Sequence, residues 1–211
     1  MQQIFSAQMA DFAAIYEDDV ELVSVKPATH DHAIDKALAV LLRHGGFSAQ
    51  WSQGVNDTIK ADEVLSSKVS DMACRALADE INAVADMLGL LLGCEAIGVR
   101  LATLNAPMCP RFHVDKVPCR FLLTLSGKGT EWIPHKDVDW AWFADRTSVI
   151  DPLLPGAASY VLPTGNWSLL KGGAWKDGFD GVVHRSPEGA DTRLFLSIDP
   201  LFSSSEEGSQ G

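Results

Sequence analysis

The stretch that decides the fold covers residues 112–132 and reads FHVDKVPCRFLLTLSGKGTEW. Its centre, Phe121 to Leu125, is an apolar run that ends at a Ser-Gly-Lys-Gly turn. Short runs rich in Phe, Leu and Thr beside glycine-bearing turns are typical of β-strands. The stretch therefore predicts a strand over 121–125, and residues 130–133 continue on the other side of the turn, as in a hairpin.

Further short runs of the same kind lie on both sides of this stretch. They cover residues 97–103, 159–162, 168–170, 181–184 and 194–198. Turns that carry Gly or Pro separate most of them, and residues 134–157, rich in Trp, Asp and Pro, are predicted to form a long loop. Many short strands at this spacing are typical of a β-sandwich or a β-barrel.

The N-terminal part of the chain has a different pattern. Apolar residues recur every three or four positions from Val64 to Leu88, which predicts an amphipathic helix with one wide apolar face. Asp62 is expected to cap the start of this helix, and Gly89 or Gly93 to end it. We expect the apolar face to pack in the core and to have no catalytic role.

Three shorter elements are expected before that helix. The sequence predicts a strand over 20–25 and a helix over 31–43, which ends at Gly45. Residues 51–60 are predicted to form a loop, because they carry no regular apolar pattern.

Together these patterns predict an α+β fold in a single domain over residues 1–202. Residues 1–93 are expected to form mainly helical support, and residues 94–202 the β core. The last residues, 203–211, read SSSEEGSQG and have nothing to bury, so they are expected to be disordered.

The overall composition narrows the possible partners. The chain has 211 residues and a formal net charge of −11, and no run of Lys and Arg suggests a basic patch. A nucleic-acid binder needs a positive surface, so DNA and RNA partners are not expected. The N-terminus shows no secretory signal, and no apolar run approaches the ~20 residues of a membrane span. We therefore expect a cytoplasmic protein without a membrane partner, in which the cysteines stay reduced.

A His-x-Asp triplet carries the predicted chemistry. Residues two apart in a strand project to the same face, so His113 and Asp115 present an imidazole and a carboxylate side by side. His184, at the end of a Gly-Val-Val run, is a suitable second histidine from a later strand. Two histidines and one carboxylate leave three positions of an octahedral ion open, as in non-haem Fe(II) oxygenases.

A second triplet of this type lies in the predicted long loop. His135 and Asp137 are expected to be solvated there, and the strands around the first triplet favour that one instead. The aromatic residues Trp140, Trp142 and Phe143 of the same loop could form a lid over a pocket.

Arg193 lies nine residues after His184, at the start of a predicted strand. A 2-oxo acid chelates Fe(II) through its keto oxygen and adjacent carboxylate, and the far carboxylate of 2-oxoglutarate then needs a buried cation. The planar guanidinium suits that role because it pairs with a carboxylate through two parallel hydrogen bonds. The alternative is a structural ion pair between Arg193 and Asp199 or Asp191.

Residues from about 95 to 200 resemble the catalytic core of the Fe(II)/2-oxoglutarate-dependent oxygenases. The order of features is similar: strand, His-x-Asp, strand, glycine-rich turn with Thr-Glu, long insert, distal His, then Arg. The resemblance implies a double-stranded β-helix of the jelly-roll, cupin-like type, with N-terminal helices packed against it. It also implies that His113, Asp115 and His184 bind Fe(II), and that Arg193 anchors 2-oxoglutarate as the co-substrate of a hydroxylase-type reaction.

The chain departs from these oxygenases beside the arginine. They often place a serine two residues after it, which also binds the oxo acid, whereas this chain has Phe195 there. The nearest serine is Ser197, which is therefore the candidate second contact to the co-substrate.

Residues 109–120, with the later Gly-Thr-Glu-Trp and Val-Val-His-Arg-Ser-Pro, also resemble a bacterial domain family of unknown function. Its members are often encoded beside zinc-homeostasis genes. This second resemblance, which covers most of the chain, implies an alternative: a non-redox, zinc-binding, cupin-like protein of metal homeostasis. A third possibility is an interaction module with a degenerate site. The sequence determines neither the substrate, whether small molecule or protein, nor the oligomeric state.

Other side chains near the first triplet have alternative roles. Cys109 and Cys119 bracket it and, together with His113, could bind structural zinc. Ligands of structural zinc sites are usually closer in sequence, so packing beneath the site is favoured for both cysteines. Arg111 and Arg120 flank the same segment and could either meet an anionic substrate or offset local acids.

Overall fold

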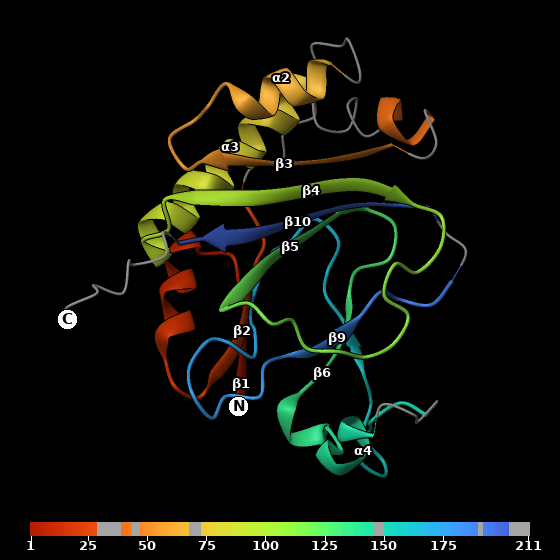
Figure 1. Ribbon diagram of the computed structural model, residues 1–211. Helices are drawn as coiled ribbons and strands as arrows, with labels where there is room; N and C mark the ends of the chain where they lie inside the picture. Colours follow the sequence, from red (N-terminus) through yellow and green to blue (C-terminus); the bar gives the residue numbers. More distant parts are fainter. Residues whose placement is uncertain (29–38, 44–46, 68–72, 146–149, 190–191, 203–211) are drawn as a thin grey trace, which may run out of the picture.

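The computed structural model describes residues 1–28, 39–43, 47–67, 73–145, 150–189 and 192–202. The fold is mixed α+β, with two β-sheets and a few helices (Figure 1). The strands are β1 (Gln2–Ser6), β2 (Val20–Val25), β3 (Ser48–Gly54), β4 (Ala96–Leu104), β5 (Cys119–Ser126), β6 (Glu131–Ile133), β7 (Tyr160–Val161), β8 (Trp167–Lys171), β9 (Val183–Arg185) and β10 (Arg193–Leu201). The helices are α2 (Lys60–Ser66), α3 (Ala73–Leu92) and α4 (Trp140–Ala144), with two 3-10 helices, η1 (Met9–Tyr16) and η2 (His135–Asp137).

The larger sheet has seven strands in the order β1-β2-β8-β5-β10-β4-β3, and the smaller sheet has three in the order β7-β6-β9. β1 and β2 pair in parallel, and every other neighbouring pair is antiparallel. The strands expected from the sequence are confirmed, with small shifts at their ends. Long-range pairing between strands far apart in the sequence builds both sheets.

The predicted hairpin between residues 121–125 and 130–133 is wrong. Strand β5 lies in the larger sheet between β8 and β10, so neither of its edges is open to β6. Strand β6 instead pairs with β7 and β9 in the smaller sheet. The glycine-rich turn therefore takes the chain from one sheet to the other.

Helix α3 covers the outer face of the larger sheet, and its predicted apolar stripe is confirmed. Leu77, Ile81 and Leu88 are fully buried, and they pack in one cluster with apolar residues of β4 and β10. The helix ends before Gly93, whose φ of 68° is the left-handed conformation that glycine adopts without strain.

The start of that helical region differs from the prediction. Residues 60–66 form the separate helix α2, which packs against α3, an arrangement that one straight helix cannot make. The side chain of Asp57, not that of Asp62, caps α2: its Oδ1 accepts hydrogen bonds from the backbone N–H groups of Ile59 and Lys60, at 3.3 and 3.2 Å.

The predicted loop over residues 51–60 is also wrong in its first half, because the whole of strand β3 pairs with residues 96–102 of β4. Ala49, Trp51 and Gln53 face the helices and are buried, whereas the alternate residues are exposed. A buried glutamine in a mostly polar segment hides the two-residue period of this strand. Residues 1–93 thus supply three strands as well as helices.

The smaller sheet packs on the inner face of the larger one, on the side away from α2 and α3 (Figure 1). Seven buried residues from both sheets and their loops form this inner cluster: Leu22, Leu122, Trp132, Leu162, Leu170, Val182 and Phe195. Side chains alternate along β10, so that Leu194, Leu196 and Ile198 face the outer core. The residues between them face the space between the two sheets.

Some expectations fall partly outside the described residues. Residues 39–43 are helical, but the remainder of the predicted helix 31–43, Gly45 and the tail 203–211 are not described. The predicted long loop contains the short helices η2 and α4. In the part of the chain that the structure describes, no helix is both long and apolar enough to cross a bilayer.

Candidate metal centre

Backbone pairing brings the two histidines of the predicted site together. His113 and His184 exchange two backbone hydrogen bonds, each with an N–O distance of 2.9 Å. This pair is an isolated bridge between β9 and the segment before β5, so His113 does not lie in a regular strand as expected. The two imidazole rings consequently lie side by side, with centroids 4.5 Å apart.

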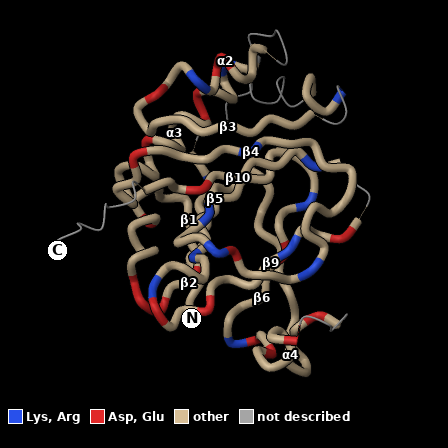
Figure 2. The backbone as a smooth tube through the Cα atoms, viewed as in Figure 1, with Lys and Arg blue, Asp and Glu red and all other residues tan. Residues whose placement is uncertain are grey.

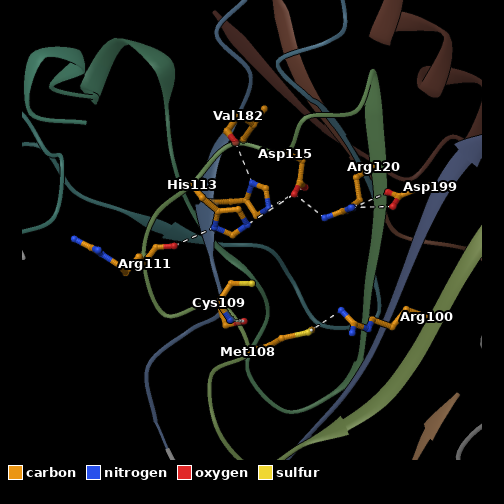
Figure 3. Close-up of polar contacts among 11 residues, drawn as sticks. Arg100, Met108, Cys109, Arg111, His113, Asp115, Arg120, Val182 and Asp199 are labelled. Atoms are coloured by element: carbon orange, nitrogen blue, oxygen red, sulfur yellow. Dashed lines mark hydrogen bonds and ion pairs between the residues drawn. The ribbon is translucent and has the colours of Figure 1, made fainter. Parts of the chain in front are cut away.

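Asp115 completes the cluster (Figure 3). Its Oδ2 lies 3.2 Å from His184 Nε2, and its Oδ1 lies 3.8 Å from His113 Nε2. One possible ligand atom from each of the three side chains lies within 4.8 Å of the others. Among the described residues, no other group of three or more His, Cys, Asp or Glu side chains meets this distance.

Both imidazoles are oriented by the backbone. His113 Nδ1 lies 3.0 Å from the carbonyl oxygen of Arg111, and His184 Nδ1 lies 3.0 Å from that of Val182. A carbonyl oxygen only accepts hydrogen bonds, so each Nδ1 carries the proton and each Nε2 presents its lone pair. Burial and the neighbouring His184 lower the pKa of His113, which favours the neutral form that binds metals.

The two oxygens of Asp115 have different surroundings. Oδ1 accepts a hydrogen bond from Arg120 Nη1 at 2.6 Å, whereas Oδ2 is buried without a hydrogen-bond partner. Because His184 Nε2 carries no proton, it faces Oδ2 as a second electron-pair donor. A cation bound between His184 Nε2 and Asp115 Oδ2 would accept a lone pair from each of them. Burial raises the pKa of Asp115, but the balance lies below the usual value, and the charged guanidinium of Arg120 at Oδ1 helps to keep the carboxyl ionised.

Arg120 links the cluster to strand β10. Its Nε and Nη2 donate to the two carboxylate oxygens of Asp199, at 2.6 and 2.8 Å, while its Nη1 holds Asp115 (Figure 3). Asp199 is thus paired with Arg120 and not with Arg193, and Asp191, the other acid considered as a partner of Arg193, lies outside the described residues. Of the two roles considered for Arg120, the structure supports the offsetting of local acids.

Arg193 lies on the same inner face of β10 but has no acidic partner among the described residues. Its residue exposure is 5%, and its Nη2 donates long hydrogen bonds to the hydroxyls of Thr124 and Thr130, at 3.3 and 3.4 Å. The guanidinium lies 4.9 Å from the ring centroid of Phe195, and its Nε is buried without a partner. Burial lowers the pKa of Arg193 to about 10.

A cavity of about 380 Å³ lies beside the two histidines, and neither Asp115 nor Arg193 lines it. His113, His184, Thr130, Phe195 and Ser197 contribute to its wall. Thr130 and Phe195 separate the Arg193 guanidinium from this space, so a small rearrangement of their side chains would give a ligand access to it. Ser197, the second predicted co-substrate contact, faces the same cavity.

A second cavity, of about 780 Å³, lies on the other side of the segment that carries the triplet. Phe112, Trp142 and Phe143 line it, which agrees with a position of α4 over a pocket. Trp140 packs instead on the ring of His135, at 4.8 Å between centroids. Closure of this helix as a lid stays a prediction.

The remaining candidates do not join the cluster. His135 Nε2 lies 3.0 Å from Asp180 Oδ2, in a surface pair. Cys119 is fully buried on β5, whereas Cys109 is exposed at the wall of the smaller cavity. The cysteine-based zinc site is therefore not formed within the described residues.

Sequence reasoning missed the buried ion pair beside the site. Arg185 follows His184 on β9, and its Nε donates to Glu131 Oε2 at 2.9 Å on the neighbouring strand β6. The signal that could have revealed this pair is one charged residue in each of two short apolar strands, Glu131 in β6 and Arg185 in β9. The pair fixes the register of the strand that carries His184.

Three solved structures illustrate what this fold is similar to. A dioxygenase for auxin oxidation from rice has a TM-score of 0.51 and 14% sequence identity, over 95% of this chain and 83% of its own. The enzyme of the same name from Arabidopsis thaliana, solved with 2-oxoglutarate, has a TM-score of 0.53 and 9% identity, over 97% of this chain and 93% of its own. A prolyl-4-hydroxylase from Pseudomonas putida has a TM-score of 0.52 and 12% sequence identity, over 93% of this chain and 100% of its own. At these identities the similarity shows a common fold.

In sequence, residues 6–199 match the model of a family described as proteins of unknown function, DUF1826. The match covers most of the chain, so the chain belongs to this family. Among curated proteins, no sequence relative was found.

Proposed function

We propose that this chain is an Fe(II)- and 2-oxoglutarate-dependent oxygenase, and that its two facing sheets are a double-stranded β-helix. The observation that carries the proposal is Arg193, a buried guanidinium without an acidic partner among the described residues, on the inner face that also holds Asp199 and Arg120 beside the triad. A buried cation is costly unless an anion pairs with it. The common fold with the oxygenases supports the same assignment.

His113, Asp115 and His184 would hold the metal, and three coordination positions would stay open. When bound, the ferrous ion would enable O₂ to react, with two electrons coming from the oxidative decarboxylation of 2-oxoglutarate to succinate and CO₂ and two from the oxidation of a substrate C–H bond. Two imidazoles oriented by backbone carbonyls and a carboxylate whose Oδ2 has no hydrogen-bond partner form a donor set that fits this ion.

The protein's own residues would perform the binding and the positioning. The backbone carbonyls fix both histidine tautomers, and Arg120 holds Oδ1 of Asp115 so that Oδ2 faces the metal. Arg193 would bind the far carboxylate of 2-oxoglutarate through its free N–H groups, with Thr130 at its side. Phe195 takes the place of the expected serine and supports the guanidinium plane, and Ser197 would contact the bound acid from the same wall.

The test is anaerobic addition of 2-oxoglutarate to the Fe(II)-loaded protein. We expect a visible charge-transfer band, and succinate once air is admitted. The variants His113→Ala and Asp115→Ala should lose both signals. His135→Ala, in a surface pair away from the triad, should keep both.

Metal analysis of protein from cells supplied with both iron and zinc distinguishes this proposal from a zinc-binding protein without redox chemistry. Tight zinc, together with no band and no succinate, would contradict the oxygenase. Unchanged metal content in His113→Ala would contradict any metal site at this triad.

A further inference from the structure

The smaller sheet covers only part of the inner face of the larger one. An apolar cluster that contains Leu22, Leu122 and Phe195 fills part of the space between the two sheets. On β3, the inward residues Gln50 and Ser52 are polar and exposed. The floor of the smaller cavity therefore continues beyond the metal centre onto a polar, uncovered part of the sheet.

The strand register places one row of side chains across this floor. Arg100 on β4 lies opposite Gln50 on β3 and Ser197 on β10, and Ser197 lies opposite Leu122 on β5. All four residues line the smaller cavity, together with His113 and His184. A molecule that extends along this row from Leu122 and Ser197 meets Arg100, and beyond it Gln50 on the edge strand.

The wall of this cavity carries more positive than negative side chains. Its charged wall residues are Arg100, Arg120, Arg185 and Asp199. Arg120 is held by Asp115 and Asp199, and Arg185 by Glu131 and Asp151. The chain carries a net charge of −11, yet several Lys and Arg positions lie around β9 and the loops beside it (Figure 2).

Arg100 differs from these two arginines, because no acid among the described residues pairs with it. Its Nη1 lies 3.1 Å from the sulfur of Met108, a weak acceptor, and its side chain is exposed to the cavity (Figure 3). A guanidinium with free N–H groups at the wall of a cavity pairs readily with a carboxylate or a phosphate.

We propose that Arg100, with Gln50 and Ser52 beside it, is the subsite for the anionic group of the molecule that is oxidised, an organic carboxylate or phosphate ester. This inference rests on the proposed function for the oxidation step. It gives different roles to two cations: Arg193, which lies behind Thr130 and Phe195, serves the co-substrate, and Arg100, in the wall of the smaller cavity, selects the substrate.

Cys109 provides a readout that needs neither iron nor a known substrate. It is exposed and lines the same cavity, next in sequence to Met108, whereas the other three cysteines are buried. Its rate of labelling can be compared between a negatively charged and a positively charged methanethiosulfonate of similar size. We expect the anionic reagent to gain about threefold or more from Arg100, because opposite charges raise the local reagent concentration.

Three variants decide the outcome. Arg100→Gln should remove the preference for the anionic reagent, and Arg100→Lys should keep most of it. Arg75→Gln, on the exposed face of α3, makes the same change in net charge and should have no effect. A preference that persists in Arg100→Gln, or that falls equally in Arg75→Gln, would overturn the proposal.

Two further measurements identify the ligand chemistry. Benzoate, inorganic phosphate or both should slow the labelling of Cys109 by iodoacetamide in the wild type but not in Arg100→Gln, and neutral benzamide should not. Equal protection by benzoate and benzamide would mean recognition by shape, against the proposal. Benzoate protecting alone would indicate a carboxylate substrate, and phosphate alone a phosphate ester; protection by neither would contradict the subsite.

The anaerobic charge-transfer band keeps the two proposals separate. Arg100→Gln should bind 2-oxoglutarate as the wild type does. Loss of the band in this variant would assign Arg100 to the co-substrate and overturn the substrate subsite. Absence of the band in the wild type would contradict the oxygenase, whereas the labelling result would stand independently.

Discussion

Replacing Arg193 by methionine should make the ligand-free protein more stable and abolish the binding of 2-oxoglutarate. Methionine keeps most of the volume of the side chain and removes its charge. The lowered pKa of about 10 corresponds to a cost of about 3 kcal/mol for holding the guanidinium charged at neutral pH. The two threonine contacts and the ring of Phe195 offset about 1–2 kcal/mol of this cost.

The net gain in unfolding free energy for Arg193→Met is therefore about 1–2 kcal/mol, or about 2–8 °C in melting temperature for a chain of this size. Thermal unfolding of the metal-loaded protein under anaerobic conditions, with and without 2-oxoglutarate, measures both effects. At about 100 times its Kd, the acid should stabilise the wild type by about 2.7 kcal/mol and the variant not at all. Arg193→Lys keeps the charge without the planar fork and should bind the acid about 10–100-fold more weakly.

Arg75→Met on the exposed face of α3 is the matched control, with an expected change below about 0.5 kcal/mol. If Arg193→Met loses several kcal/mol of stability, then the guanidinium is already satisfied in the ligand-free protein. Its role would then be structural, and the reasoning for the co-substrate site would be refuted.

Three other substitutions test the surroundings of the site. Arg120→Met frees Oδ1 of the metal-binding carboxylate and should weaken metal binding about 10–100-fold, measured by competition with a chelator. Glu131→Gln removes one of the two acids that hydrogen-bond to Arg185 and should lower the free energy of unfolding by about 2–3 kcal/mol, measured with denaturant at pH 7. Burial raises the pKa of Glu131, but its contacts with Arg185 and Ser159 lower it more, so its contribution should be present above pH 4.5 and lost as the pH falls further through the lowered pKa. Gly129→Ala places a Cβ 1.8 Å from the carbonyl oxygen of Leu162 and should destabilise the fold by about 3 kcal/mol or more.

The controls for these substitutions lie nearby. Gly54→Ala meets no atom closer than 3.8 Å and should have little steric effect. Asp199→Asn should weaken metal binding less than Arg120→Met, because the guanidinium stays in place. If metal affinity is unchanged in Arg120→Met, the bridge to Asp115 has no influence on the ligand. If Glu131→Gln is neutral at pH 7, Asp151 alone satisfies Arg185.

The sequence predicts the residues of the candidate site better than their backbone setting. The spacing of His113 and Asp115 indicates that they share a face, and the structure brings both to His184. The pairing of His113 with β9 as an isolated bridge could not be predicted, because it depends on contacts between residues about 70 positions apart. The surroundings of Arg193 could not be predicted either, since its contacts with Thr124 and Thr130 come from residues more than 60 positions away in the sequence.

The errors in the fold arise where tertiary contacts override local pattern. The turn after Ser126 is typical of a hairpin, but β5 already has two neighbours, so the chain crosses to the other sheet. The inward residues of β3 do not all read as apolar in the sequence, because one of them is Gln53. Its buried side chain is accommodated by hydrogen bonds with Trp51 and Asn82. In both places the decisive information is which sheet edge is open, and that is a property of the whole fold.

The distribution of buried polar atoms without partners separates a ligand site from a structural polar core. Among the described residues three such atoms occur: Asp115 Oδ2, Trp132 Nε1 and Arg193 Nε. Trp132 lies opposite His184 on the paired strands and belongs to the inner cluster, and Arg193 lies on the inner face of β10, whereas Asp115 lies beside both histidines. A structural network satisfies its own members, because each orphaned group costs about 1–3 kcal/mol. In the proposed function, a bound cation would satisfy the acceptor beside the two imidazoles, and the far carboxylate of a chelating acid would satisfy the donor on the guanidinium.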